Sequence, residues 1–307
     1  MVRILITGGA GFIGSSLGER FLKDQRYEVT VVDNLLTGDK GKVPLHPRCT
    51  FIKCDVNRLD EISAVMTANR FDYVFHYAAV VGVKRTIENP LMVLNDLEGI
   101  KNVLSLCKTT GVKRIFYSSS SEVYGEPTEM PQHEDTTPLN SRLPYAVVKN
   151  AGESFCRSYQ KEFGLNYTIF RFFNTYGPKQ STDFVISRFL RLALTNKPIT
   201  IYGNGTQTRT FCYINDNTDC TVRIVEDDLM INQVINIGSE VDVTILQLAE
   251  LIIRMTGSAS KIEFLPPLSE GDMSRRQPDA TKMKAILRRE LIGLEAGIRK
   301  IIDSVAP

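Results

Sequence analysis

The chain begins with a short apolar run, residues 2–7, that leads directly into the glycine-rich segment Gly8-Gly-Ala-Gly-Phe-Ile-Gly14. Glycines at positions 8, 11 and 14 have the spacing of a phosphate-binding turn between a strand and a helix. The first glycine allows a tight turn, the second lets backbone approach a pyrophosphate, and the third lets the helix pack on the strand. This segment therefore predicts a helix over about 12–23 and an α/β fold that binds a dinucleotide.

An acidic residue lies at the expected distance from the glycine turn. A second strand-like run, 28–32, ends at Asp33, which lies 19 positions after Gly14. In dinucleotide-binding folds a carboxylate about 20 positions beyond the turn binds the ribose hydroxyls. A negative charge there repels a 2′-phosphate, so the sequence predicts NAD rather than NADP.

Strand-like runs alternate with amphipathic stretches through the first 175 residues, which indicates a doubly wound parallel sheet. The expected strands span 2–7, 28–33, 50–54, 72–77, 113–118 and 167–173. Polar residues follow the ends of these strands, at the edge where open α/β sheets bind ligands; they are Gly8, Asp33, Asp55, His76, Ser118 to Glu122, and Asn174. Beyond residue 175 the pattern is less regular, with helices expected near 183–195 and 244–256. We therefore expect a Rossmann-type doubly wound parallel sheet over 1–175 and a smaller C-terminal α/β lobe over 176–307, with the chain crossing between them.

Tyr145 and Lys149 are four positions apart, so in a helix their side chains share one face. A free tyrosine titrates near pH ~10 and is a weak base at neutral pH. A neighbouring ammonium favours the phenolate, so the pair can accept a proton from an alcohol. A hydroxyl of the serine run 118–121 can hold that alcohol in place. Beside a dinucleotide, this set indicates hydride transfer from an alcohol carbon.

The composition argues against several other classes of protein. The formal net charge is +2, which gives no reason to expect nucleic acid or a membrane surface as a partner. No apolar run approaches the ~18 residues of a membrane span, and a first strand that begins at residue 2 leaves no room for a signal peptide. Six cysteines and three histidines lack the spacing of a metal site, so no metal is predicted. The cysteine number fits a reduced protein, which predicts a cytoplasmic location.

With Gly8 to Gly14, Asp33, Asp55, Ser120 and the Tyr145/Lys149 pair in this order, the chain resembles the extended short-chain dehydrogenase/reductases. It looks like their nucleotide-sugar epimerase/dehydratase branch over nearly its whole length. The resemblance implies NAD as cofactor and a nucleotide diphosphate sugar as substrate, with a UDP-sugar favoured. The cofactor-binding residues that it implies are Gly8, Gly11, Phe12, Ile13, Gly14, Asp33, Asn34, Asp55, Val56, Tyr77, Ala78, Ala79, Asn95, Ser118, Tyr145 and Lys149.

The segments 171–178 and 201–209 resemble the parts of this family that hold the sugar diphosphate. An arginine fork suits that role because it matches phosphate oxygens bidentately. The substrate-binding residues implied are Lys84, Ser120, Glu122, Asn174, Tyr202, Arg209 and Arg276, and the catalytic residues implied are Ser120, Glu122, Tyr145 and Lys149. In the implied mechanism Tyr145 takes the proton of the sugar 4-hydroxyl while NAD accepts the C4 hydride. A transient 4-ketone then permits one further step before the hydride is returned.

Three reactions are open for that further step. Glu122 resembles the acid of nucleotide-sugar lyases, whereas simple 4-epimerases usually carry a small hydroxyl residue there. Ser121 replaces an acid that is usual in glucose-type 4,6-dehydratases, and the segment 275–279 resembles the Arg-x-Pro segment of UDP-glucuronate decarboxylases. In contrast, the residues between Tyr145 and Lys149 lack the acidic residue and glycine found there in many decarboxylases. The segment 82–85 looks more similar to epimerases. UDP-glucuronate decarboxylation is the favoured interpretation, with UDP-sugar 4-epimerisation and then dehydration as alternatives.

Two alternatives belong to different classes. A net NAD(P)-dependent alcohol dehydrogenase or reductase is disfavoured by Asn174 and Arg209, because a small hydrophobic substrate needs no diphosphate clamp. A dinucleotide sensor without activity is disfavoured by the intact Ser120, Tyr145 and Lys149 set. The helices expected near 94–109 and 145–162 resemble those that pair across the dimer interface of this family, which predicts a homodimer.

Overall fold

The computed structural model describes residues 1–267 and 275–305, which form two compact units. Unit 1 comprises Met1–Val123, Leu139–Phe172 and Thr218–Ile235, and unit 2 comprises Tyr124–Pro138, Phe173–Asn217 and Asn236–Pro307. Neither unit is a continuous stretch of sequence, because the chain passes from one to the other several times.

Unit 1 is built on a seven-stranded sheet with the strand order β11-β6-β5-β4-β1-β2-β3, of which only the last two residues of β11 belong to unit 2. All neighbouring strands from β3 across to β6 pair in parallel. The strands are β1 Val2–Thr7, β2 Tyr27–Asp33, β3 Cys49–Lys53, β4 Tyr73–His76, β5 Arg114–Ser120, β6 Asn166–Phe172 and β11 Gln233–Ile237. The Rossmann-type fold and its first six strands are therefore confirmed, and β11 is a seventh strand that the sequence pattern does not predict.

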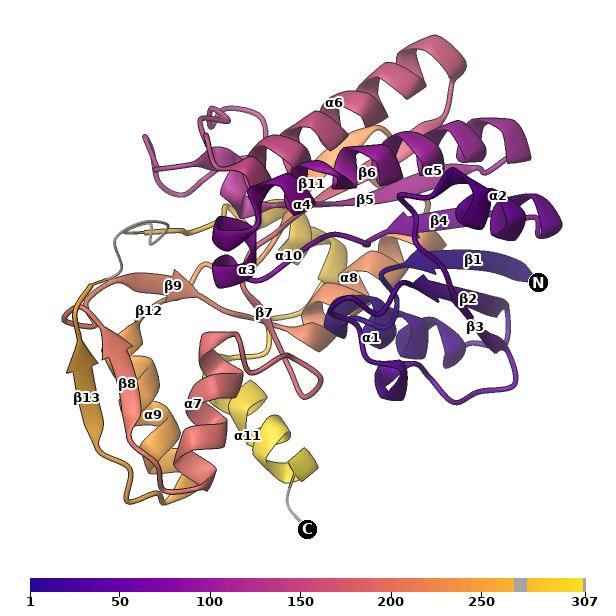
Figure 1. Cartoon of the computed structure of the whole chain (residues 1–307). Helices are drawn as coiled ribbons and strands as arrows, with labels where there is room; N and C mark the ends of the chain where they lie inside the picture. Colours follow the sequence, from indigo (N-terminus) through magenta and orange to yellow (C-terminus); the bar gives the residue numbers. More distant parts are fainter. Residues whose placement is uncertain (268–274, 306–307) are drawn as a thin grey trace. The chain divides into compact units, whose positions relative to one another are not determined.

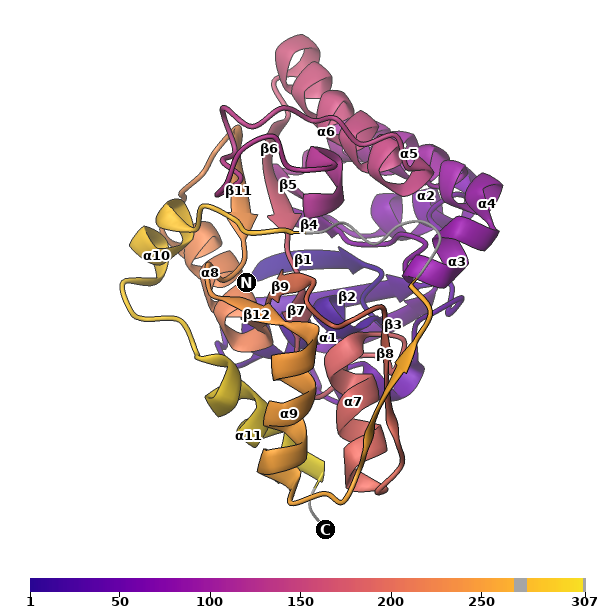
Figure 2. The same ribbon diagram turned by 90° about the vertical axis from the view of Figure 1, so that its left-hand side faces the viewer.

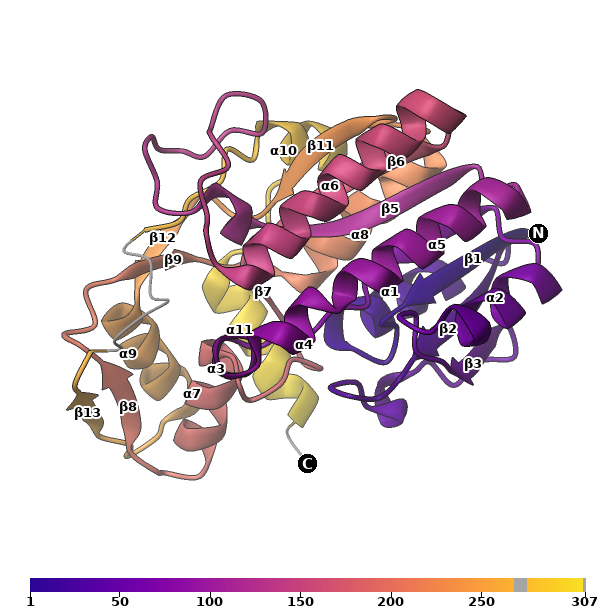
Figure 3. The same ribbon diagram turned by 45° about the horizontal axis from the view of Figure 1, so that its top comes forward.

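Helices cover both faces of this sheet (Figure 1). The helices α2 Leu59–Ala68, α5 Asp96–Thr110 and α6 Pro144–Phe163 lie side by side on one face (Figure 3). On the other face lie α1 Phe12–Leu22 and the later part of α8 Ile214–Glu226. The short helices α3 Val83–Glu88 and α4 Pro90–Leu94 precede α5. Both faces of the sheet are covered, which explains why its strands read as nearly continuous apolar runs.

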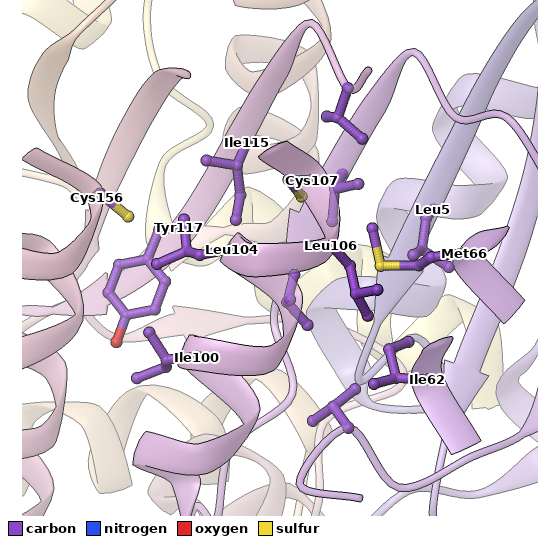
Figure 4. Close-up of a cluster of buried hydrophobic side chains, with 14 of the residues drawn as sticks. Leu5, Ile62, Met66, Ile100, Leu104, Leu106, Cys107, Ile115, Tyr117 and Cys156 are labelled. Atoms are coloured by element: carbon purple, nitrogen blue, oxygen red, sulfur yellow. The ribbon is translucent and has the colours of Figure 1, made fainter. Parts of the chain in front are cut away.

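A cluster of buried apolar side chains joins the sheet to α2, α5 and α6 (Figure 4). Leu5, Ile115 and Tyr117 come from the strands, Ile62 and Met66 from α2, and Ile100 and Leu104 from α5. Close packing of this kind keeps the strands and helices in fixed register. The C-terminal ends of the parallel strands are therefore a rigid platform for the polar residues that follow them.

Unit 2 contains three small two-stranded sheets. They pair β7 Thr175–Tyr176 with β10 Cys212–Tyr213, β8 Ile199–Tyr202 with β13 Ile262–Leu265, and β9 Thr208–Thr210 with β12 Asp242–Thr244. The helices α7 Val185–Leu194 and α9 Ile245–Thr256, both expected from the sequence, pack side by side (Figure 2). The helices α10 Thr281–Leu287 and α11 Leu294–Val305 follow. At the start of α9 the Thr244 hydroxyl accepts a hydrogen bond from Gln247 N and the Gln247 side chain accepts one from Thr244 N, which fixes this end of the helix.

Candidate active site

In the glycine turn after β1, the absence of side chains lets the backbone approach the start of α1 closely. Gly8 has φ +66°, and a Cβ added to it would lie 2.6 Å from Ala78 N. A Cβ added to Gly14 would lie 2.7 Å from Gly8 O, so the turn and the helix approach each other as only glycine permits. Gly11 caps α1, whose first N–H groups are the ready-made donors for an anion. This cradle fits the pyrophosphate of NAD, with Phe12 and Ile13 in the first helical turn.

Acidic and amide side chains gather at the ends of β2 and β3. Asp33 accepts hydrogen bonds from Ala10 N at 3.1 Å and Leu35 N at 2.8 Å, while burial raises the pKa of its carboxyl. The Asn34 amide donates to Asp55 Oδ2 at 3.2 Å. Val56 follows Asp55 and is buried. The structure thus ties Asp33 to the glycine turn and brings Asn34 next to Asp55, and the cofactor-binding roles expected of these residues stay predictions.

The segment after β4 is tied to β1. The Thr7 hydroxyl accepts from Tyr77 N and Ala78 N, each at 3.2 Å, and lies 2.9 Å from His76 Nδ1. Burial lowers the pKa of His76 to about 3, so this imidazole is neutral and has a packing role rather than a proton-carrying one. These bonds hold Tyr77 and Ala78 against the glycine turn, and Ala79 follows them.

The catalytic candidates meet at the C-terminal end of β5. Lys149 Nζ donates to Ser118 O at 2.7 Å and lies 3.3 Å from the Ser118 hydroxyl. The same ammonium lies 5.7 Å from the centre of the Tyr145 ring, one helical turn earlier on α6. Burial lowers the pKa of Lys149 to about 8, and the Asp96 carboxylate partly opposes that shift. At neutral pH the lysine is therefore still mainly charged and favours the phenolate of Tyr145.

Ser120 and Glu122 follow immediately. The Ser120 hydroxyl accepts a hydrogen bond from Glu122 N at 3.2 Å, and Ser120 is buried. Glu122 lies in a short 3-10 turn, Ser121–Tyr124, directly after β5. The structure therefore brings Ser118, Ser120, Glu122, Tyr145 and Lys149 together within unit 1.

Asp96 is a residue of this region that the sequence reasoning missed. It opens α5 next to Asn95, and its Oδ2 accepts a hydrogen bond from Val80 N at 2.7 Å. Burial raises the pKa of this carboxyl, and the charge of Lys149 opposes the rise. An acid at the start of a helix is too common a signal to single out from sequence.

The expected diphosphate-binding residues lie in unit 2. The Asn174 amide donates to Thr210 O at 3.2 Å, which places it next to β9, the strand of Arg209. The Arg209 guanidinium donates to Thr208 O at 2.7 Å, and Tyr202 ends β8. For Lys84 the structure describes the backbone in α3 but not the side chain.

Two neighbouring arginines of unit 2 have different environments. Arg276 is buried, with 7% of its surface exposed. Arg275 is exposed and lies 3.4 Å from Asp242 in an ion pair. An exposed ion pair contributes little, so Arg275 is the weaker candidate for binding an anion, and Arg276 keeps the role expected from the sequence.

Neither a metal centre nor a membrane span is found in the parts that the structure describes. No group of three or more His, Cys, Asp or Glu residues among positions 1–267 and 275–305 is arranged to hold a metal ion. Over the same residues no helix combines the length and the apolar character that crossing a membrane requires.

The comparisons with known proteins agree with this geometry. Residues 4–238 match the NAD dependent epimerase/dehydratase family. A UDP-N-acetyl-alpha-D-glucosaminuronate decarboxylase of Bacillus cytotoxicus is 36% identical, over 98% of this chain and 97% of that protein. The UDP-glucuronic acid 4-epimerase from Bacillus cereus, solved with UDP-glucuronic acid and NAD, is 31% identical with a TM-score of 0.89, over 98% of each chain. The UDP-glucose 4-epimerase of Thermotoga maritima, solved with UDP-glucose, is 29% identical with a TM-score of 0.92, again over 98% of each chain.

The chain therefore belongs to the NAD dependent epimerase/dehydratase family. It is an NAD-dependent enzyme that modifies a nucleotide sugar. The family, the fold, the cofactor and the class of activity expected from the sequence are confirmed. The roles of individual site residues stay predictions.

Proposed function

We propose that this enzyme decarboxylates UDP-glucuronate through a transient ketone at C4 of the sugar. The observation that carries the C4 oxidation in this proposal is the buried Lys149 ammonium, held at the end of β5 next to the Tyr145 ring and Ser118. A uronate substrate is supported by the buried Arg276 and by the names of two relatives, a glucosaminuronate decarboxylase and a glucuronic acid 4-epimerase.

Bound NAD would supply a hydride acceptor that is reduced and then reoxidised within one turnover. The chain's own residues control the proton. Tyr145, as the phenolate, accepts the proton of the sugar 4-hydroxyl, and the charge of Lys149 keeps the phenolate accessible near neutral pH. Ser120 donates a hydrogen bond to the sugar 4-oxygen and holds C4 in place. Returning the proton from Tyr145 completes the cycle.

Glu122 and Arg276 distinguish the decarboxylation from other outcomes. Arg276 binds the C6 carboxylate in a charge-assisted pair. With a ketone at C4, that carboxylate belongs to a β-keto acid, which loses CO2 readily. The C5–C6 bond breaks, and its electron pair stays on the sugar as the enolate of the 4-ketone. C5 must then gain a proton, and Glu122 is the carboxyl group that we assign to deliver it.

We assign the two units different ligands. Unit 1 binds NAD through the glycine turn 8–14, the acids after β2 and β3, the segment 77–79 and Asn95. Unit 2 binds the nucleotide diphosphate through Asn174, Tyr202 and Arg209. Arginine and asparagine suit this role because they match phosphate oxygens with several donors.

A UDP-sugar 4-epimerase is the second candidate. It is supported by two similar structures that are named as 4-epimerases of UDP-glucuronic acid and UDP-glucose. In an epimerase the 4-keto sugar only has to rotate so that its other face is reduced. Glu122 then has no proton to deliver. Dehydration comes next, because Glu122 in the role of a C5 base would expel water.

A homodimer is the proposed assembly, formed through α5 and α6. Exposed apolar side chains lie on and beside α6: Leu91 on α4 is 75% exposed and Val147 is 46% exposed. Apolar surface on neighbouring helices favours burial by a second copy. Sedimentation as a monomer at micromolar concentration would contradict this assembly.

Mass spectrometry of the products tests the proposed reaction. The enzyme is incubated with NAD and, separately, UDP-glucuronate, UDP-glucose, UDP-N-acetylglucosamine and GDP-mannose. The proposal predicts a product that has lost the mass of CO2 from UDP-glucuronate, and a Glu122→Gln variant that forms it slowly. An unchanged mass with a new chromatographic peak, and normal activity of Glu122→Gln, would establish the epimerase instead. Loss of water would establish a dehydratase.

A further inference from the structure

Glu153 is a buried carboxylate that the mechanism above does not use. It lies one helical turn after Lys149 on α6, so Tyr145, Lys149 and Glu153 share one face of the helix. Glu153 has 0% of its surface exposed. A buried carboxylate is costly unless partners satisfy both of its oxygens. The question is therefore which groups hold it there.

The partners of Glu153 come from two adjacent strands and from α6 itself. The Ser119 hydroxyl donates to Oε1 at 2.6 Å. The Arg171 guanidinium grips both oxygens, with Nε 2.9 Å from Oε1 and one terminal nitrogen 2.8 Å from Oε2. Arg157, one turn later on α6, donates to Oε2 at 3.0 Å. Hydrogen bonding and the two guanidinium charges hold the pKa of Glu153 below its usual value despite burial.

This cluster fixes α6 at the strand end that carries the chemistry. Ser119 on β5 and Arg171 on β6 are direct partners in the parallel register of the two strands. Ser119 lies between Ser118, which holds Lys149, and Ser120. Immediately before Glu153, Gly152 packs on Tyr117, so closely that an added Cβ would overlap the tyrosine hydroxyl. The glycine contact and the carboxylate contacts together set both the height and the rotation of the helix.

We propose that Glu153, Arg171 and Ser119 are positioning residues that set the register of α6 on β5 and β6, and thereby hold the Tyr145 phenol at its working distance from Ser120 and keep the Lys149 ammonium on Ser118, beside that phenol. The inference rests on the catalytic roles proposed above for Tyr145, Lys149 and Ser120. A stabilising role alone does not explain the cluster, because an apolar pair of similar volume is often as stable as a buried ion pair. Orientation matters more, since a displacement of about 1 Å in an active site costs on the order of 10²-fold in rate.

The charged surroundings of Tyr145 and Lys149 make such a displacement measurable. His76 from β4 and Tyr117 from β5 are neutral, because burial lowers the pKa of the first and raises that of the second. Asp96 from α5 and Glu153 contribute negative charge. Lys149 is then the positive charge that favours the Tyr145 phenolate. If α6 shifts on β5, the Lys149 ammonium loses its hydrogen bonds to Ser118 and is no longer fixed beside the Tyr145 ring, so the pKa of Tyr145 rises.

The test uses a double variant, Glu153→Leu with Arg171→Met, in the full chain. The single variant Glu153→Gln leaves Arg171 buried without its anion, so both its melting temperature and its kcat fall. The double variant removes both charges and recovers most of the melting temperature. We expect its kcat to stay about 10- to 100-fold below that of the unmodified enzyme. The substrate is UDP-glucuronate or UDP-glucose, whichever the unmodified enzyme converts. The KM and NADH binding, followed by fluorescence, stay close to those of the unmodified enzyme.

Two further readouts separate positioning from stability. The acidic limb of the kcat profile moves to higher pH in the double variant. Ultraviolet difference titration of the NAD-free protein against its Tyr145→Phe variant shows the same upward shift of the tyrosine pKa without any turnover. If the double variant fails to fold, Ser119→Ala removes a single tie and is expected to show the same shifts on a smaller scale.

Arg114→Met is the matched control, because it removes a buried arginine from the opposite end of β5. It is expected to lower stability and leave the pH profile unchanged. Recovery of full kcat and an unshifted tyrosine titration in the double variant would overturn the positioning role. The proposed function fails in a different way, by absence of turnover in the unmodified enzyme, and the tyrosine titration still decides the positioning role in that case.

Discussion

Strand β5 has a buried cation at each end, and the two are held in different ways. At its start, the Arg114 side chain is 3% exposed, pairs with the carboxylate of Asp228 and donates to Leu229 O at 2.7 Å. At its C-terminal end, Lys149 makes its hydrogen bonds to Ser118 oxygens and has its pKa lowered to about 8 by burial. The first cation is matched by an anion and serves the fold. The second keeps a charge that burial disfavours and that the Asp96 carboxylate only partly offsets, which is typical of a group that serves chemistry.

The largest expected effect is that of Tyr145→Phe, which removes the proton acceptor and leaves the Lys149 ammonium in place. Turnover should fall by roughly 10³-fold or more, toward the upper part of the range for general acid–base catalysis. NAD binding, measured by isothermal titration, should change little because the ring is retained. Turnover near the normal rate in this variant would show that the Lys149 end of β5 is not the chemical end.

Lys149→Met removes the buried cation itself, and its effects on activity and stability should have opposite signs. The turnover number should fall by about 10²-fold, since the phenolate loses its stabilising charge. The folded pKa of about 8 lies below the ~10.4 of an exposed lysine, so the unfolded chain binds the proton more tightly between these values. The cost of burying the ammonium is fully present below pH 8 and disappears as pH rises toward ~10.4.

Unfolding measured at several pH values tests directly whether burial of the Lys149 ammonium destabilises the protein. At pH 7 the Lys149→Met protein, free of NAD, should be more stable than the unmodified protein by about 1–3 kcal/mol in urea unfolding. The difference should shrink as the pH is raised from 8 to 10. A variant that is less stable at pH 7 would show that the Ser118 hydrogen bonds outweigh the cost of burial.

The arginines at 275 and 276 extend the comparison to unit 2, since one is exposed and paired and the other is buried. Arg276→Ala should raise the KM for UDP-glucuronate by about 10- to 100-fold, the value of a charge-assisted contact. Arg275→Ala, the matched control, should leave the KM within about twofold, as expected for an exposed ion pair. Equal effects of the two substitutions in steady-state kinetics would remove Arg276 from the carboxylate site.

The smallest effect on activity is expected for Arg114→Met, at the structural end of β5. The Leu229 carbonyl loses its donor, while Asp228 is already 69% exposed and needs no partner. Unfolding free energy should fall by about 1–2 kcal/mol, with kcat unchanged at a temperature where the variant is folded. A loss of kcat comparable to that of Lys149→Met would show that the two ends of the strand are not functionally distinct.

The parts of the fold that depend on local pattern could be predicted, and those that depend on distant pairing could not. The strands β1 to β6 and the glycine turn have signals within a few residues of sequence. In contrast, β11 pairs with β6 at the edge of the sheet after the chain returns from unit 2, and no local pattern shows which distant strand it joins. The cluster at Glu153 is similar, because its spacing from Lys149 is visible in sequence but its contact with Arg171 depends on the sheet.

The site shows the same division. Tyr145 and Lys149 lie one turn apart on α6, as the helical spacing predicts, whereas the contact of Lys149 with Ser118 depends on how α6 packs on β5. The different environments of Arg275 and Arg276 are invisible in sequence, since burial of one neighbour and exposure of the other depends on the surrounding fold of unit 2.

The most direct measurement is the fate of a C4 deuterium label in UDP-glucuronate. If the sugar is oxidised at C4 and reduced again on the enzyme, the product is lighter by CO2 and keeps its deuterium at C4. Reduced cofactor should not accumulate in solution while the substrate is consumed. A product with hydrogen from solvent at C4, or NADH released in proportion to substrate, would contradict the account and identify a net dehydrogenase.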